Sequence, residues 1–158
     1  MKQHNNPTAR PAVVTDSQAI ADLINIYAMQ ELVLFRTKAD IIKHISNFIV
    51  AEDSDDKVIA CCAARDFSNG LFEIRSLAVN PEKKGLGYGR IVIKATINRL
   101  LAKGVAKKIF ALTYQGGFFE KMGFHKVNKE IFPEKIWSDC SNCPKKDCCD
   151  EEAYLLNC

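Results

Sequence analysis

The chain has 158 residues, 47% of them hydrophobic, which suits one buried core and argues against a second domain. Charged residues of both signs make up 26% of the chain, and a formal net charge of +3 is too small to indicate a nucleic-acid partner. No apolar window approaches the length of a membrane span and residues 1–11 are too polar for a signal peptide, so we expect a cytoplasmic protein.

The first half of the chain alternates between short strands and helices. The pattern predicts a strand over 12–14, followed by a helix that a capping box at 15–18 opens. The apolar stripe of that helix consists of Ile20, Leu23, Ile24 and Tyr27. A shorter helix is predicted over 38–46. Two apolar runs at 48–51 and 58–64, separated by an acidic turn, predict an antiparallel hairpin.

The second half continues the alternation around a glycine-rich segment. Residues 71–79 form the longest predicted strand, which the following Asn-Pro pair ends. A helix is predicted next, with an apolar face formed by Ile93, Ile97, Leu100 and Leu101. A strand over 108–113, one or two helical turns over 118–122 and a last strand over 124–131 complete the pattern. The order predicts a mixed α/β (α+β) domain with a central sheet.

The glycine-rich segment is called the glycine loop below; its residues are Lys84, Gly85, Leu86, Gly87, Tyr88, Gly89 and Arg90. A strand, a turn and a following helix place free backbone N–H groups at a helix N-terminus, which favours a pyrophosphate ligand. A surface turn with solvated lysines is the alternative. Two better-known phosphate loops are excluded, because Arg90 stands where a dinucleotide fingerprint needs glycine and no Gly-Lys-Ser/Thr end is present.

The segment 74–89 resembles motif A of the GCN5-related N-acetyltransferases, with Lys84 in place of the usual Arg or Gln and Gly87 and Gly89 at the later positions. The resemblance implies a mixed sheet of about six or seven strands with about four helices over 1–136, and acetyl-CoA as co-substrate. It also assigns pantetheine binding to the backbone of Leu77, Ala78 and Val79.

A closer resemblance is to the short, single-domain N-acetylglutamate synthases. It rests on residues 72–79, on 110–115 with 118–119, and on 135–151. It implies acetylation of the α-amine of an amino acid, L-glutamate, in arginine biosynthesis. Acetylation of another amine, on a protein N-terminus or a small molecule, and a non-catalytic CoA-binding sensor stay open, as does a homodimer. No nucleic acid or membrane partner is expected.

Acetyl transfer to an amine needs a base, and Glu73 on the motif strand is the candidate. Strand alternation predicts one face that carries Glu73, Arg75, Leu77 and Val79. The alternative for the first two residues is an ion pair on a solvated face. The family's usual late-helix tyrosine, a proton donor, is replaced here by Phe119.

A glutamate acceptor carries two carboxylates, which arginine can bind through two parallel hydrogen bonds. Arg36 and Arg75 are the candidates, and the resemblance places Arg36 beside the substrate entrance; an exposed helix-start residue is its alternative. Thr113 and Gln115 could add hydrogen bonds from the end of their strand.

Five of the seven cysteines crowd into a tail, 137–158, which we expect to pack on the domain. They are Cys140, Cys143, Cys148, Cys149 and Cys158. Cys140, Cys143 and Cys149 with one further ligand could hold a structural zinc ion. Reduced packing thiols or a disulfide are the alternatives.

Overall fold

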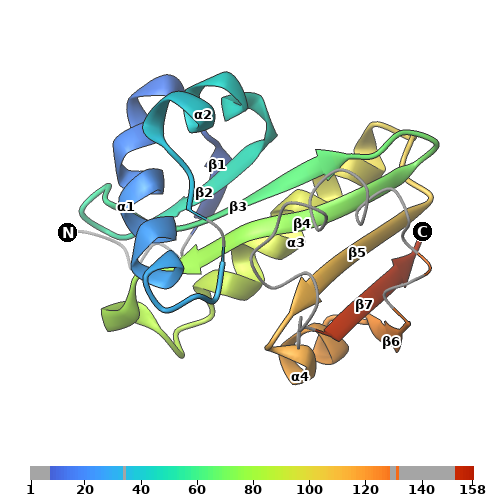
Figure 1. Cartoon of the computed structure of the whole chain (residues 1–158). Helices are drawn as coiled ribbons and strands as arrows, with labels where there is room; N and C mark the ends of the chain where they lie inside the picture. The colour runs from blue at the N-terminus through green and yellow to red at the C-terminus, as the bar shows by residue number, and fades with distance from the viewer. Residues whose placement is uncertain (1–7, 34, 129–130, 132–151) are drawn as a thin grey trace. The chain divides into compact units, whose positions relative to one another are not determined.

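The computed structural model describes residues 8–33, 35–128, 131 and 152–158 (Figure 1). Its seven strands hydrogen-bond in the order β1-β2-β3-β4-β5-β7-β6, and the sheet is mixed, as the sequence predicts. The described residues divide into two compact units: those within 8–64 with Ile74–Ala102, and Arg65–Glu73 with those within 103–158. Within the described ranges, no helix combines the length and the apolar character that crossing a membrane requires.

The first unit contains most of the helical structure. Its elements are β1 (Thr8–Pro11), α1 (Ser17–Ala28), α2 (Lys38–Lys43), β2 (Phe48–Glu52), most of β3 (Val58–Asp66), the second part of β4 (Leu71–Val79), and α3 (Tyr88–Ala102). Short 3-10 turns occur at Val14–Asp16, Ile45–Asn47 and Pro81–Lys83. The predicted helices and the β2–β3 hairpin are confirmed, with shifts of a few residues at their ends.

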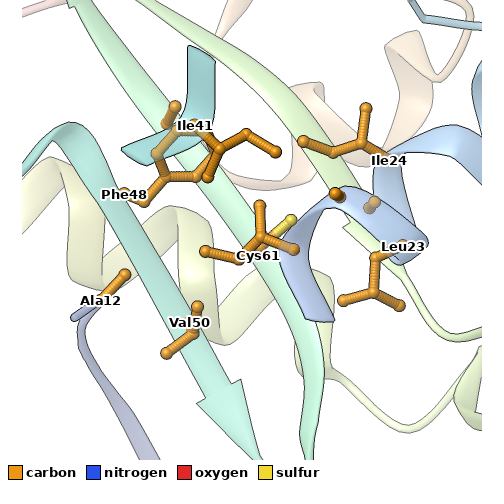
Figure 2. Close-up of a cluster of buried hydrophobic side chains, with 11 residues drawn as sticks. Ala12, Leu23, Ile24, Ile41, Phe48, Val50 and Cys61 are labelled. Atoms are coloured by element: carbon orange, nitrogen blue, oxygen red, sulfur yellow. The ribbon is translucent and has the colours of Figure 1, made fainter. Parts of the chain in front are cut away.

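Both faces of the sheet in the first unit are covered. On one face, side chains from β2 and β3 such as Phe48 and Cys61 pack against Ile24 of α1 and Ile41 of α2 (Figure 2). On the other face, alternate residues of the same strands pack against Val92 of α3. Because successive strand residues point to opposite faces, the continuous apolar runs of β2 and β3 reflect burial on both sides.

The N-terminal predictions were wrong in two details. The first strand lies at Thr8–Pro11 rather than 12–14, where it pairs antiparallel with β2. The capping box at 15–18 does not form. Instead the Asp16 carboxylate accepts a hydrogen bond from the Val13 amide at 2.8 Å and two from the Arg10 guanidinium at 2.8 and 3.0 Å. Arg10 lies on β1, and the pairing of β1 with β2 places it near Asp16. The residue types around Asp16 do not predict this contact.

Substitution of Asp16 by asparagine is expected to lower the free energy of unfolding at neutral pH by about 2 kcal/mol, since a buried charged acceptor of three hydrogen bonds is lost. Hydrogen bonds from Arg10 hold the pKa of Asp16 below its ordinary value of 3.8, against the opposing effect of burial. The stabilisation is therefore present above pH 3.8 and is lost as pH falls through the lowered pKa. Urea unfolding of both proteins between pH 3 and 7 checks this; an equal loss of stability on acidification in both would contradict it.

The second unit is built on β5 (Lys108–Thr113), which pairs parallel with Leu71–Glu73 of β4 and antiparallel with β7 (Glu152–Asn157). Strand β6 (His125–Val127) pairs antiparallel with β7, and the short helix α4 (Gly116–Lys121) precedes it. Phe110, Ala153 and Leu155 form one buried cluster of this unit. Strand β6 is shorter than the predicted 124–131, and β7 falls in the stretch that the sequence assigns to the tail.

The three cysteines proposed for zinc, Cys140, Cys143 and Cys149, lie outside the described residues. In the part of the chain that is described, no three His, Cys, Asp or Glu side chains gather as a metal site would require. Cys158 follows β7 as an exposed free thiol. Nothing in the described structure supports a zinc ion.

Candidate functional site

The glycine loop follows β4 as an exposed turn that contains two left-handed glycines. Asn80 ends β4, and its side chain accepts a hydrogen bond from the Glu82 amide at 3.0 Å, which starts the 3-10 turn before the loop. Gly85 and Gly87 have φ angles of 80° and 88°, in the left-handed region that side chains disfavour. A Cβ atom at either glycine would meet nothing within 4 Å, so the outer side of the loop is open to a ligand.

Helix α3 begins at Tyr88, directly after this open segment. The Ile91 amide donates to the Gly87 carbonyl at 3.1 Å, and helical geometry leaves the amides before it without an intrahelical acceptor. Lys84 and Arg90 are exposed beside these amides. Free amides, the dipole of a 15-residue helix and positive side chains together suit a diphosphate, so these residues fit the pyrophosphate of CoA.

The end of β4 is held from both sides. Leu77 and Val79 pack with Val92 of α3, whereas Ala78 packs into the cluster under α1 and α2. The Val79 carbonyl accepts a hydrogen bond from the Tyr27 hydroxyl of α1, so one of the predicted pantetheine-binding groups already has a protein donor. A carbonyl oxygen has a second lone pair for a ligand.

Ser76, within β4, has a φ angle of 53°, in the left-handed region. Its hydroxyl accepts a hydrogen bond from Arg36 Nη1 at 3.2 Å, and its carbonyl accepts from the Cys61 thiol at 3.5 Å. A left-handed backbone conformation is unfavourable for serine and persists only where the surrounding structure imposes it. The two hydrogen bonds to Ser76 supply that constraint. Leu77 and Val79 pack in one cluster and Ala78 in the opposite one, so side chains alternate after Ser76. The shared face of Glu73 and Arg75 with Leu77 and Val79 stays a prediction.

Arg36 is held firmly in the first unit rather than extending from a helix start into solvent. Its side chain is 14% exposed, and its guanidinium carbon lies 5.1 Å from the centroid of the Phe48 ring. Arg36 Nε donates to Asp40 Oδ2 at 2.7 Å. Partial burial raises the pKa of Asp40, but the hydrogen bond and charge of Arg36 outweigh it, so this pKa lies below its ordinary value. Arg75 is half-buried on β4.

Three predicted site residues belong to the second unit. Glu73 is 2% exposed and stands in register with Phe110 of β5. The Thr113 hydroxyl accepts a hydrogen bond from the Gln115 amide at 2.8 Å, which shapes the turn into α4 and leaves the Gln115 side chain exposed. Phe119, where the family's tyrosine would stand, is 2% exposed and packs edge-on against the Phe124 ring.

Residues 44–126 match the family model of the acetyltransferase (GNAT) domain. The chain belongs to the GNAT family of N-acetyltransferases. An N-acetyltransferase of Chlorobaculum tepidum, CT2212, is 43% identical over 92% of this chain and 93% of its own length. The amino-acid acetyltransferase of Mycobacterium tuberculosis is 33% identical over 81% of this chain and 76% of its own length.

Solved structures agree with this assignment to the GNAT family. Rv2747 from Mycobacterium tuberculosis in complex with CoA superposes with a TM-score of 0.81 at 27% identity, covering 96% of this chain and 99% of that one. The N-acetylglutamate synthase from Neisseria gonorrhoeae, complexed with coenzyme A and N-acetyl-glutamate, gives 0.84 at 25% identity, covering 98% of this chain. This GNAT chain spans only 36% of that synthase. The chain described here is an acetyl-CoA-dependent N-acetyltransferase of GNAT type.

Sequence reasoning missed three residues of this GNAT domain. Asp40 lies four residues after Arg36, a spacing at which helical ion pairs form, and could have been found. Tyr27 was placed in the core stripe of α1, although its hydroxyl reaches β4. Ser76 carried no signal, because its backbone angle depends on contacts with residues far away in the chain.

Proposed function

We propose that this chain transfers the acetyl group of acetyl-CoA to the α-amine of L-glutamate. The main support is the environment of Arg36, an arginine held by Asp40 and Ser76 at the motif strand, with its guanidinium oriented before any acceptor arrives. An arginine fixed in this way binds a carboxylate with little further loss of side-chain entropy. The names of the relatives favour an amino acid acceptor, and the gonococcal synthase favours glutamate.

In this proposal one set of residues binds acetyl-CoA and Glu73 accepts a proton from the acceptor. Acetyl-CoA supplies the acetyl group as an activated thioester. Amides and positive side chains of the glycine loop bind the pyrophosphate, while the backbone of Leu77, Ala78 and Val79 accommodates the pantetheine arm. Glu73 accepts the proton that the acceptor ammonium must lose, directly or through a water molecule.

The remaining acceptor contacts and the leaving thiolate complete the proposal. Arg75, Thr113 and Gln115 add contacts to the acceptor. Phe119 carries no transferable proton, so the thiolate takes its proton from water or from a tyrosine, Tyr88 or Tyr114.

Substitution of Arg36 by lysine is expected to raise the KM for glutamate by about 10- to 100-fold, because an ammonium cannot make the paired hydrogen bonds of a guanidinium. The KM for acetyl-CoA should stay within about two-fold, since the proposed role involves only the acceptor. Steady-state kinetics with each substrate varied in turn checks this.

Arg65→Lys is the matched control, because Arg65 also lies over an aromatic ring, that of Phe67 at 4.5 Å, but has no proposed contact with the acceptor. Asp40→Asn should raise the KM for glutamate less than Arg36→Lys does, because it loosens the guanidinium without removing it. A rise in both KM values by the same factor in Arg36→Lys would contradict the acceptor-binding role.

A further inference from the structure

Tyr27 links α1 to the end of β4 and the start of the glycine loop, a segment far along the chain from the helix. It lies in the last turn of α1, where the buried residues Ile20, Leu23 and Ile24 fix the helix against the sheet. Its ring is half-buried against that same cluster. Its position is therefore set by the core rather than by solvent, and a side chain that rests on this ring is held in a defined place.

The hydroxyl and the ring face of Tyr27 contact different parts of the cofactor-binding segment. The hydroxyl donates to the carbonyl of Val79, the last residue of β4 and 52 positions further along the chain. The ring face lies under Lys84, whose Nζ is 5.1 Å from the ring centroid. That distance is within the range in which an ammonium is attracted by an aromatic ring.

Lys84 needs such a support more than an arginine would. Its ammonium is a point charge on a flexible four-carbon stem, and the side chain is exposed at the first position of the glycine loop. An unsupported lysine there loses rotamer freedom when it meets a phosphate, which offsets part of the attraction. The Tyr27 ring restricts the ammonium before the ligand binds.

We propose that Tyr27 is a positioning residue for CoA, which holds the Lys84 ammonium beside the pyrophosphate-binding amides and fixes the end of β4 through the Val79 carbonyl. The proposal rests on the cofactor part of the proposed function and is independent of the acceptor. It predicts that Tyr27 and Lys84 act as a coupled pair rather than as two separate contributors.

The test is a double-mutant cycle on CoA affinity, measured by isothermal titration calorimetry. Lys84→Met should weaken CoA binding by about five-fold in the wild-type background and equally in Tyr27→Phe, which keeps the ring. In Tyr27→Leu, which removes the ring, Lys84→Met should weaken CoA binding by less than about two-fold. Tyr27→Phe alone should weaken CoA binding by about two- to ten-fold, through loss of the hydrogen bond to Val79.

Ile26→Ala is the matched control, because Ile26 precedes Tyr27 on α1 and is 37% exposed. Thermal unfolding of every variant separates loss of fold from loss of affinity. An equal cost of Lys84→Met in all three backgrounds would overturn the proposal, as would the absence of any cost in the wild type. If the cycle shows the coupling but the wild-type protein does not acetylate glutamate, the proposed acceptor is refuted and the role of Tyr27 in CoA binding stands.

Discussion

Substitution of Glu73 by glutamine is expected to lower kcat by about 10²- to 10³-fold while the dissociation constant for CoA changes by less than about two-fold. An amino acid is protonated at its amine near neutral pH, and the ammonium has no lone pair with which to attack a thioester. Glutamine matches the shape of glutamate at this buried position but cannot accept a proton. The step that suffers is therefore amine activation, whereas cofactor binding through the glycine loop is unaffected.

Three measurements make the test of Glu73 specific. The residual rate of Glu73→Gln should increase with pH, because a growing share of the acceptor is then already deprotonated in solution. Glu120→Gln, at an exposed carboxylate on α4, is the control and should keep full activity. Titration calorimetry with CoA shows that the variant is folded and binds. Unchanged turnover in Glu73→Gln with glutamate would show that the base lies elsewhere.

Substitution of Gly87 by alanine is expected to weaken CoA binding by more than about ten-fold, the second large effect. The φ angle of 88° is unfavourable for alanine by about 1 to 2 kcal/mol. Apart from its chain neighbours, no described residue comes within 4 Å of the added Cβ, so the fold itself has room for it. In the proposed complex this space belongs to the ligand, and the methyl group prevents the pyrophosphate from approaching the backbone.

Gly104 provides a matched control for Gly87, because its φ angle is also positive, 69°, and a Cβ there also meets nothing within 4 Å. It follows the C-terminal end of α3, at the opposite end of the helix from the glycine loop. Gly104→Ala should therefore lower the unfolding midpoint to a similar extent but leave CoA affinity unchanged. If both variants lost the same CoA affinity, backbone strain rather than ligand approach would be the cause.

Much of the first unit could be predicted because its signals are local. The apolar periodicity of α1 and α3, the acidic turn between β2 and β3, and the Asn-Pro pair after β4 each specify their element within a few residues. The glycine loop could also be read locally, because positive φ angles at Gly85 and Gly87 are a property of the residue type.

The remaining features depend on pairing between distant segments. Strand β7 was missed because a cysteine-rich stretch precedes it, and its strand character comes from its partners β5 and β6. The 3-10 turn before α1 is held by the Asp16 carboxylate, which also binds Arg10 of β1. The left-handed Ser76 is held by hydrogen bonds from Arg36 and Cys61, so its backbone conformation could not be predicted from its neighbours in the sequence.

Acetyl transfer to glutamate is tested most directly by thiol release from acetyl-CoA, measured with the purified, reduced protein across all twenty amino acids. Mass measurement of the product identifies which amine was modified. We expect turnover with glutamate and a product that carries one added acetyl group. Tight CoA binding without turnover on any amino acid would contradict the claim and favour another amine acceptor or a CoA sensor.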